Sequence, residues 1–189
     1  MTPISRTPSY STYTPDGMSL YQYGDKTYLV TANEDDARAD WNDGGKGYSE
    51  EVRVKDITAK IKLDAAKLKG FTKEQLDLMK TDGTFTDDKK LGRLQVSNAV
   101  YSVTGAVYYD ALYGFGGRSF SIWDADDIQA GPVGDAFEQI TAQLLPVYFN
   151  SDHESVKFDN RNSGKGPEPE DGKVCGTDST SPSCLPSPA

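Results

Sequence analysis

The chain is built from short runs in which apolar and polar side chains alternate, and glycine-centred turns separate these runs. The first pair is Ser19–Tyr23 and Thr27–Thr31, with Gly24 in the turn between them. Tyr28 and Val30 share one face of the second run, as in a half-buried strand whose successive side chains point to opposite sides. These residues predict a β-hairpin.

The same alternation returns further along the chain. Val52 and Val54 alternate with charged residues in Ser49–Lys55, which predicts a half-buried strand or, equally, an exposed face. Further strand-length runs are Arg93–Val100, Val107–Phe115 and Arg118–Trp123, and shorter strand or turn signals lie at Asp135–Ile140 and Val147–Phe149. Gly116 and Gly117 predict that the two runs beside them form a tight hairpin.

A stretch of helical periodicity interrupts the strands. Apolar residues recur at helical spacing at Ile57, Ile61, Ala65 and Leu68. Gly70 ends this run, and Thr72 with Gln75 predicts a capping box that opens a second short helix reaching Met79. We therefore expect a helical insertion over residues 56–80, packed beside the sheet.

Length and composition limit the architecture. At 189 residues the chain suits one domain, and its eleven tyrosines and eighteen glycines favour strands and turns over a helical bundle. Residues 1–17 predict an extended or disordered lead-in, residues 18–170 the domain, and residues 171–189 a Ser/Pro-rich tail. Repeated antiparallel hairpins are typical of a sandwich, barrel or propeller. A propeller blade takes about 40 to 50 residues, so a propeller here would hold about two blades.

The charge balance bears on partners. The chain has 29 acidic and 20 basic residues, for a net charge of -9. Such a field repels nucleic-acid phosphates and anionic lipid surfaces, so we expect no nucleic-acid partner. Excess carboxylates suit calcium, which takes oxygen ligands, although a solvated surface that keeps the chain soluble is the alternative. The sequence shows no membrane span and no signal-peptide pattern.

Two polar segments concentrate ionisable side chains, Asn33–Asp43 and Ser151–Glu170, and each follows a strand signal. Glycine and proline around Glu168 hold the backbone in a defined turn, which suits a carboxylate that meets a cation. A plain solvent-exposed loop is the alternative. If the sheets bring both loops to the same rim, the two loops form one shared site.

Successive motifs of the chain resemble those of a known family. The motifs are TYLVTANEDDAR, GYSEEVRVKDI, LGRLQVSN, LYGFGGRSFSIWDAD, FEQITA, FNSDHE and DNRNSGKGPEPE, in order from Pro15 to Glu170. They are similar to motifs of the choice-of-anchor I family, some of whose members carry the description alkaline phosphatase. The resemblance implies a β-propeller displayed at the cell surface or outside the cell, usually within a longer chain. It also implies a distant similarity to phytase-like propellers, whose carboxylates bind calcium and phosphate.

The resemblance implies site residues in both polar loops and in the strands between them. As metal ligands it implies Glu34, Asp152, Asp159, Glu168 and Glu170. For an anionic ligand it implies Asn33, Arg38, Arg118, Arg161 and Lys165. Glu50, Glu51 and Arg53 also match the family motif, and structural ion pairs are the favoured interpretation of Glu51, Arg53 and Arg118. Carboxylates would hold calcium, while arginines would clamp a phosphate or carboxylate group.

The chain departs from the family pattern at two places. Asp35 stands where the family usually has glycine, and the resemblance ends after GPEPE. We therefore expect a mainly β fold whose antiparallel hairpins form part of a β-propeller, incomplete at about two blades, with the missing blades as partners. Three functions fit: a cell-surface or extracellular module binding calcium or a small anionic ligand, a metal-dependent phosphoester hydrolase, or an inactive fragment of such a protein.

Overall fold

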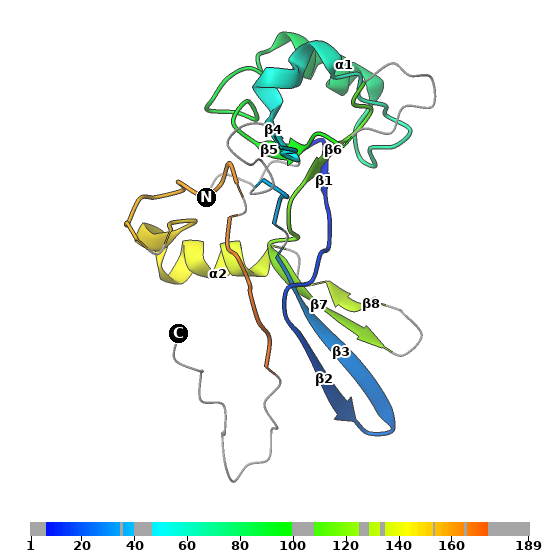
Figure 1. The fold of residues 1–189 in the computed structure, drawn as a ribbon, viewed down its shortest axis with the longest axis vertical. Helices are drawn as coiled ribbons and strands as arrows, with labels where there is room; N and C mark the ends of the chain where they lie inside the picture. Colours follow the sequence, from blue (N-terminus) through cyan, green and yellow to red (C-terminus); the bar gives the residue numbers. More distant parts are fainter. Residues whose placement is uncertain are drawn as a thin grey trace.

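The computed structural model of the chain describes residues 7–34, 36–39, 47–99, 108–124, 129–132, 135–152, 154–164 and 166–173. Three small sheets and a few helices make up this part of the chain (Figure 1). The lobe with helix α1 lies at one end of the molecule, and a four-stranded sheet lies at the other.

The four-stranded sheet has the order β2-β3-β7-β8, and all of its neighbouring strands are antiparallel. Its strands are β2 (Met18–Tyr23), β3 (Lys26–Asn33), β7 (Ser119–Asp124) and β8 (Gln129–Pro132). The predicted first hairpin is confirmed, because β2 pairs with β3 from Met18↔Thr31 to Tyr23↔Lys26. Gly24 lies in its turn with a φ of 59°, a conformation that glycine adopts at little cost.

The predicted hairpin across Gly116 and Gly117 is wrong. Strand β6 (Leu112–Gly114) pairs in parallel with β1 (Ser9–Ser11), whereas β7 pairs with β3. The glycines carry the chain from one sheet to the next: the Gly117 amide donates to the carbonyl of Asn33, at the end of β3. A Cβ at Gly117 would lie 2.7 Å from the Tyr13 ring, so the close approach of the N-terminal segment requires glycine.

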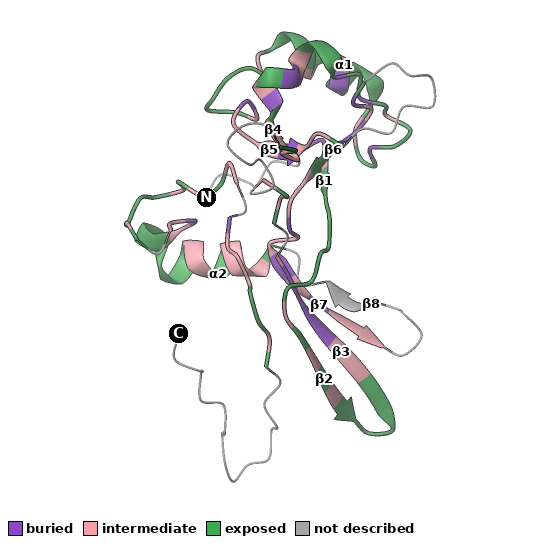
Figure 2. Ribbon diagram, in the orientation of Figure 1, coloured by how far each residue is buried: buried purple, intermediate pink, exposed green. Residues whose placement is uncertain are grey.

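The third sheet joins β4 (Glu51–Arg53) to β5 (Gln95–Ser97) in antiparallel register. Both predicted strands are confirmed in shortened form. The first ends early because Val54, fully buried, begins the 3₁₀ helix η2 (Val54–Lys60). Val54 and Val96 belong to the main hydrophobic cluster, which also contains Ile57, Ile61, Leu63, Leu68, Leu76, Phe85, Tyr109, Ala111 and Leu112. Figure 2 shows this buried cluster in the lobe around α1.

The helical insertion is partly as predicted. Helix α1 (Lys73–Thr81) begins with the predicted capping box, in which the Thr72 hydroxyl accepts from the Gln75 amide and the Gln75 side chain accepts from the Thr72 amide. The helix predicted from Ile57 to Leu68 is wrong beyond η2. Ile61 bridges to Tyr109 instead, so the apolar spacing reflects burial in the cluster rather than a continuous helix.

The strand or turn signals at 135–140 and 147–149 are also wrong. These residues fall in helix α2 (Ala136–Leu144) and in the 3₁₀ helix η3 (Pro146–Tyr148). Phe137 of α2 packs on Phe120 of β7, with ring centroids 5.8 Å apart. A short apolar run is compatible with both the strand and the helix period, so its spacing alone does not decide between them.

The prediction of a mainly β chain with small antiparallel sheets and few helices is confirmed. The strands of the described residues do not form a closed sheet, so the propeller stays a prediction. Among the same residues, no helix is long and apolar enough to cross a bilayer.

Candidate functional site

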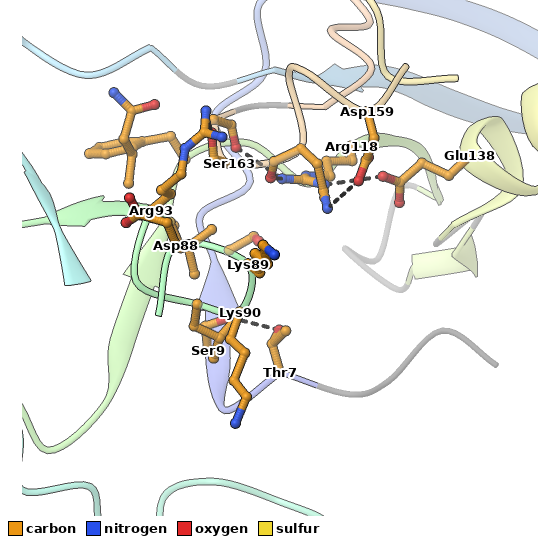
Figure 3. Close-up of a pocket in the computed structure, with 18 of the residues that line it drawn as sticks. Thr7, Ser9, Asp88, Lys89, Lys90, Arg93, Arg118, Glu138, Asp159 and Ser163 are labelled. Carbon is orange, nitrogen blue, oxygen red and sulfur yellow. Dashed lines mark hydrogen bonds and ion pairs between the residues drawn. The ribbon is translucent and has the colours of Figure 1, made fainter. Parts of the chain in front are cut away.

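A cleft of about 830 Å³ lies between the N-terminal segment, the loop that leads into β5, and the loop at 159–164. Charged and polar side chains from distant parts of the sequence line it, among them Lys89, Arg93, Arg118, Glu138, Asp159 and Ser163. Figure 3 shows Arg118, Glu138 and Asp159 gathered at one end and Arg93 toward the other.

Arg118 ties three segments together at this end of the cleft. Its Nη1 donates to Glu138 Oε1 at 3.1 Å and to Asn162 Oδ1 at 2.9 Å. Its Nη2 donates to the carbonyls of Asn162 and Gly164, at 2.7 and 2.9 Å. The four Nη hydrogens of a guanidinium are thereby matched by four acceptors. Arg118 thus forms the ion pair that its structural interpretation predicts, and a ligand would have to displace one of these partners.

Glu138, Asn150, Asp159 and Asn162 complete this cluster, which we call the Arg118 cluster. Asn150 is buried, and its Nδ2 donates to Glu138 Oε1 at 2.8 Å and to Asp159 Oδ1 at 3.3 Å. Asn162 Nδ2 donates to Asp159 Oδ2 at 3.2 Å. Both carboxylates of the cluster therefore accept hydrogen bonds: Glu138 from Arg118 and Asn150, and Asp159 from the amides of Asn150 and Asn162.

The backbone of the Arg118 cluster is unusual. Arg118, Asn150 and Asp159 have φ angles of 50°, 43° and 58°, and they are the non-glycine residues with positive φ in the described part of the chain. Such conformations cost energy for a residue with a Cβ and persist where the surroundings hold them. Glycine at position 166 leaves room for the Arg118 side chain, because a Cβ there would lie 2.9 Å from Arg118 Nη1.

The other wall of the cleft is basic. Arg93 Nη2 donates to the hydroxyl of Ser163 at 3.3 Å, and Lys89 lines the same cavity. The nearby carboxylate of Asp88 already pairs with Lys55 at 2.8 Å. That hydrogen bond from Lys55 lowers the pKa of Asp88, so Asp88 stays charged and matched at neutral pH.

Three of the remaining candidates of the 152–170 segment, Asp152, Arg161 and Glu168, have partners within it. Arg161 pairs with Glu168 through Nη2 and Oε1. Asp152 Oδ1 accepts from the backbone amides of Ser155 and Glu154, and the bond from Ser155 is the main cause of its lowered pKa. The carbonyl of Glu170 lies against Gly17, far along the chain. Lys165 lies outside the described residues, as does the side chain of His153.

The first loop contributes to a different place. Asn33 is fully buried and bonds within the sheet, its Nδ2 donating to the hydroxyls of Ser119 and Ser121 at 3.1 and 2.9 Å. Arg38 Nε pairs with Glu50 Oε2 at 2.8 Å, and this hydrogen bond lowers the pKa of Glu50. Arg38 and Glu50 line a second cleft, separate from the one beside Arg118.

Two further residues of the matched family motifs, Glu34 and Glu51, also have interaction partners. Glu34 has a partner of its own. Glu51 Oε2 accepts from Gln95 Nε2 at 2.8 Å, across the β4–β5 pair.

Only three of the residues predicted as one site line a cleft, and the other described candidates, Asn33, Glu34, Asp152, Arg161, Glu168 and Glu170, line neither. Arg118 and Asp159 line the first cleft and Arg38 the second, while Phe115 lines both. The sequence interpretation missed Glu138, Asn150, Asn162, Lys89 and Arg93. A doubled lysine in a charged loop was a visible signal for Lys89, whereas nothing in the spacing of the two asparagines marked them.

Calcium would need several oxygen ligands converging on one point. Among the residues that the structure describes, no three His, Cys, Asp or Glu side chains are grouped in a way that could hold a metal ion. Glu168 pairs with Arg161, and the Asp152 carboxylate accepts a hydrogen bond from the backbone amide of Ser155. The donor set of the described residues thus does not fit a calcium ion as it stands.

Comparison with known proteins gives one match. The model of a family described as the choice-of-anchor I domain matches residues 1–180. No curated protein and no solved structure matches the chain.

Proposed function

The chain belongs to the choice-of-anchor I domain family, and from this premise we propose that it binds a small anionic ligand in the cleft beside Arg118. The family membership supports a β-rich module associated with the cell surface, which agrees with the small antiparallel sheets of the fold. The observation that carries the proposal is the basic wall of Lys89 and Arg93 opposite a cluster whose carboxylates already accept hydrogen bonds from Arg118 and two asparagines.

The charges of the cleft leave an excess of positive donors. Glu138 pairs with Arg118, and Asp88 pairs with Lys55. The Arg93 guanidinium has five N–H donors, and one of them donates to the Ser163 hydroxyl. Guanidinium and ammonium donors together suit a phosphate or carboxylate group, since a charge-assisted hydrogen bond is stronger than a neutral one. In a chain of net charge -9, such a local basic wall is the surface that an anion can approach.

The Arg118 cluster supports this role by fixing the far wall. Its hydrogen bonds join β7, α2 and the 159–164 loop, so the cavity is largely formed before a ligand arrives. A pre-formed site avoids the cost of ordering side chains on binding. In this proposal Arg118 positions the wall, and Lys89 with Arg93 contact the ligand.

The propeller is the fold we propose for the complete domain. The sheet β2-β3-β7-β8 has four antiparallel strands in chain order, which is the make-up of one propeller blade. The segment between Asn33 and Ser119 would then be an insertion within that blade. An experimental structure with a second four-stranded sheet packed face to face on this one would support the assignment.

Isothermal titration with inorganic phosphate tests the anion site. We expect millimolar or tighter binding, weakened about tenfold or more by Arg93→Gln and by Lys89→Gln, because each change removes a charged contact. Lys73→Gln is the matched control: Lys73 lies on α1, its side chain is 79% exposed, and it should leave the affinity unchanged. Phosphate binding that survives both cleft variants would contradict the proposal.

Calcium dependence is a separate proposal that rests on the family resemblance, which implies Asp152, Asp159, Glu168 and Glu170 as ligands; in the present arrangement Glu168 would have to leave Arg161 to bind the ion. Calcium would compete with Arg161 for Glu168, so we expect a modest rise in the thermal midpoint at millimolar calcium. Glu168→Gln should abolish that rise. A thermal midpoint that is the same in calcium and in chelator would contradict the calcium proposal without affecting the anion-site proposal. Release of p-nitrophenol from p-nitrophenyl phosphate in the same samples would favour the hydrolase instead.

A further inference from the structure

The second cleft has a different chemical character from the first. Its volume is about 660 Å³, within the range of small-molecule sites. Aromatic rings line it together with paired charges and hydroxyl groups. The lining residues used below are Tyr108, Tyr113, Arg38, Glu50, Lys67 and Asp110.

Two tyrosines offer ring surface to this cleft. Tyr108 and Tyr113 are 43% and 44% exposed, so part of each ring is accessible to a ligand. Tyr10 stacks on Tyr113 with ring centroids 5.7 Å apart, and Lys62 Nζ lies 3.4 Å from the centroid of the Tyr108 ring. These contacts help to position both rings.

Four of the five charged side chains that line the second cleft are arranged in two ion pairs, and the fifth, Asp36, also has an interaction partner. Arg38 pairs with Glu50 at 2.8 Å, and Glu50 also accepts from the Ser97 hydroxyl at 2.9 Å. Lys67 pairs with Asp110. Each pair cancels most of its own field while keeping hydrogen-bond donors and acceptors at the cavity wall. A ligand of high net charge gains little here, whereas a neutral ligand with many hydroxyl groups finds both kinds of partner.

From this arrangement we infer that the second cleft binds a neutral saccharide, with the Tyr108 and Tyr113 rings against its C–H faces. A pyranose ring has an apolar face that packs on an aromatic surface, and its hydroxyl groups act as both donors and acceptors. The Arg38–Glu50 and Lys67–Asp110 pairs supply the complementary groups at the wall.

The saccharide site is independent of the proposed anion site. Phe115 lines both clefts, but the charged residues of one are absent from the other. A neutral saccharide therefore should not compete with phosphate. Variants of Arg93 should leave saccharide binding intact, and variants of Tyr108 should leave phosphate binding intact.

Saturation-transfer NMR with four neutral trisaccharides tests the inference. The probes are cellotriose, maltotriose, mannotriose and N,N′,N″-triacetylchitotriose. We expect saturation transfer to at least one of them, with an affinity weakened about tenfold by Tyr108→Ala and by Tyr113→Ala, because each variant removes a stacking surface. Excess inorganic phosphate should not reduce the signal.

Two control variants separate the cleft from general effects. Tyr23→Ala removes a tyrosine that is 77% exposed on β2, and Arg93→Gln alters the first cleft, so both should bind the saccharide as the parent chain does. Circular dichroism checks the fold of each variant. If Tyr113→Ala fails to fold because its stacking on Tyr10 is lost, Tyr108→Ala decides the outcome. No saturation transfer to any probe, full affinity in a folded Tyr108→Ala variant, or displacement by phosphate would each overturn the inference.

Discussion

Arg118 shows how one side chain can organise a site without contacting its ligand. Its donors reach Glu138 on α2 and the backbone of the 159–164 loop, so three separate segments meet at one guanidinium. The side chain is 21% exposed, which shields these bonds from water and strengthens them. A planar guanidinium, whose N–H donors point in fixed directions, can satisfy these four acceptors at once, whereas the lysine ammonium cannot.

We therefore expect Arg118→Lys to lower the free energy of unfolding by about 2 kcal/mol, since several charge-assisted bonds are lost and Glu138 keeps a single partner charge. Urea denaturation followed by circular dichroism measures this change. The exposed Lys73→Gln variant is the control and should stay within about 0.5 kcal/mol of the parent. A midpoint for Arg118→Lys equal to that of the control would show that the cluster adds nothing to stability.

Asn33 is a second residue whose environment defines its role. It is buried, its Nδ2 donates to two serines of β7, and its Oδ1 accepts from the Thr31 hydroxyl at 2.9 Å. This polar ladder joins β3 to β7 on the inner face of the four-stranded sheet. The amide suits the place because it provides donors and an acceptor together.

Asn33→Asp should destabilise the chain by about 2 kcal/mol or more at neutral pH, because a carboxylate cannot donate to Ser119 or Ser121 and its burial is costly. The loss should shrink on acidification, when the protonated acid regains a donor. Thermal unfolding of both proteins across the acid range measures this. Equal midpoints for Asn33→Asp and the parent at neutral pH would contradict the buried ladder.

At the level of elements, short local signals set the ends of helices and the turns of hairpins. The capping box at Thr72 starts α1, and Lys73 and Lys80 both bond to Asp77 along its surface. The helix buries one residue fully, Leu76, against the main cluster. Its start is therefore defined by the cap, and its place in the lobe by the apolar contacts of Leu76 and Met79.

Thr72→Ala should lower the free energy of unfolding by about 1 kcal/mol, the usual cost of losing an N-cap side chain. Gln75→Glu is a matched control, because glutamate at this position also completes a capping box and favours the positive end of the helix. Chemical denaturation of the two variants gives the comparison. A Gln75→Glu variant as unstable as Thr72→Ala would argue against the box as the cause.

At the scale of the whole molecule, the chain crosses repeatedly between the lobe around α1 and the four-stranded sheet. Strand β6 pairs with β1, whereas β7 belongs to the four-stranded sheet, and Gly116 and Gly117 lie between β6 and β7. The two clefts lie along these crossings and share Phe115. Their walls therefore depend on the relative placement of both parts.

Surface carboxylates across both parts predict acid sensitivity. Hydrogen bonds from Lys73 lower the pKa of Asp77 to about 2, and Arg38 lowers that of Glu50. A folded-state pKa below the unfolded value means that the unfolded chain binds more protons in acid. The stabilisation is present above about pH 4, the ordinary pKa of these groups, and is lost as the pH falls toward the folded values.

The thermal midpoint should therefore fall steadily between about pH 4 and pH 2, where positive self-repulsion below the isoelectric point acts in the same direction. Glu50→Gln should reduce the midpoint at neutral pH and flatten this dependence. Calorimetry over the acid range tests both statements. A midpoint that rises on acidification through this window would contradict them.

The sequence alone was sufficient for features whose physical cause is local. The β2–β3 hairpin follows from alternation around Gly24, and the start of α1 follows from two side chains three positions apart. The mainly β character followed from the same local patterns, and the family from ordered motifs. In each case the interacting groups are neighbours in the chain, so their spacing carries the information.

The tertiary structure was needed wherever partners are distant in sequence. Arg118 and Asn162 are 44 positions apart, and the Thr12 hydroxyl reaches the Gly114 carbonyl across 102 positions. Such contacts determine the parallel pairing of β1 with β6 and the passage of the chain between two sheets at Gly116 and Gly117. They also determine which of the predicted site residues line each cleft. Many pairings of a short strand satisfy its local pattern equally well, and only the packing of the whole chain selects one of them.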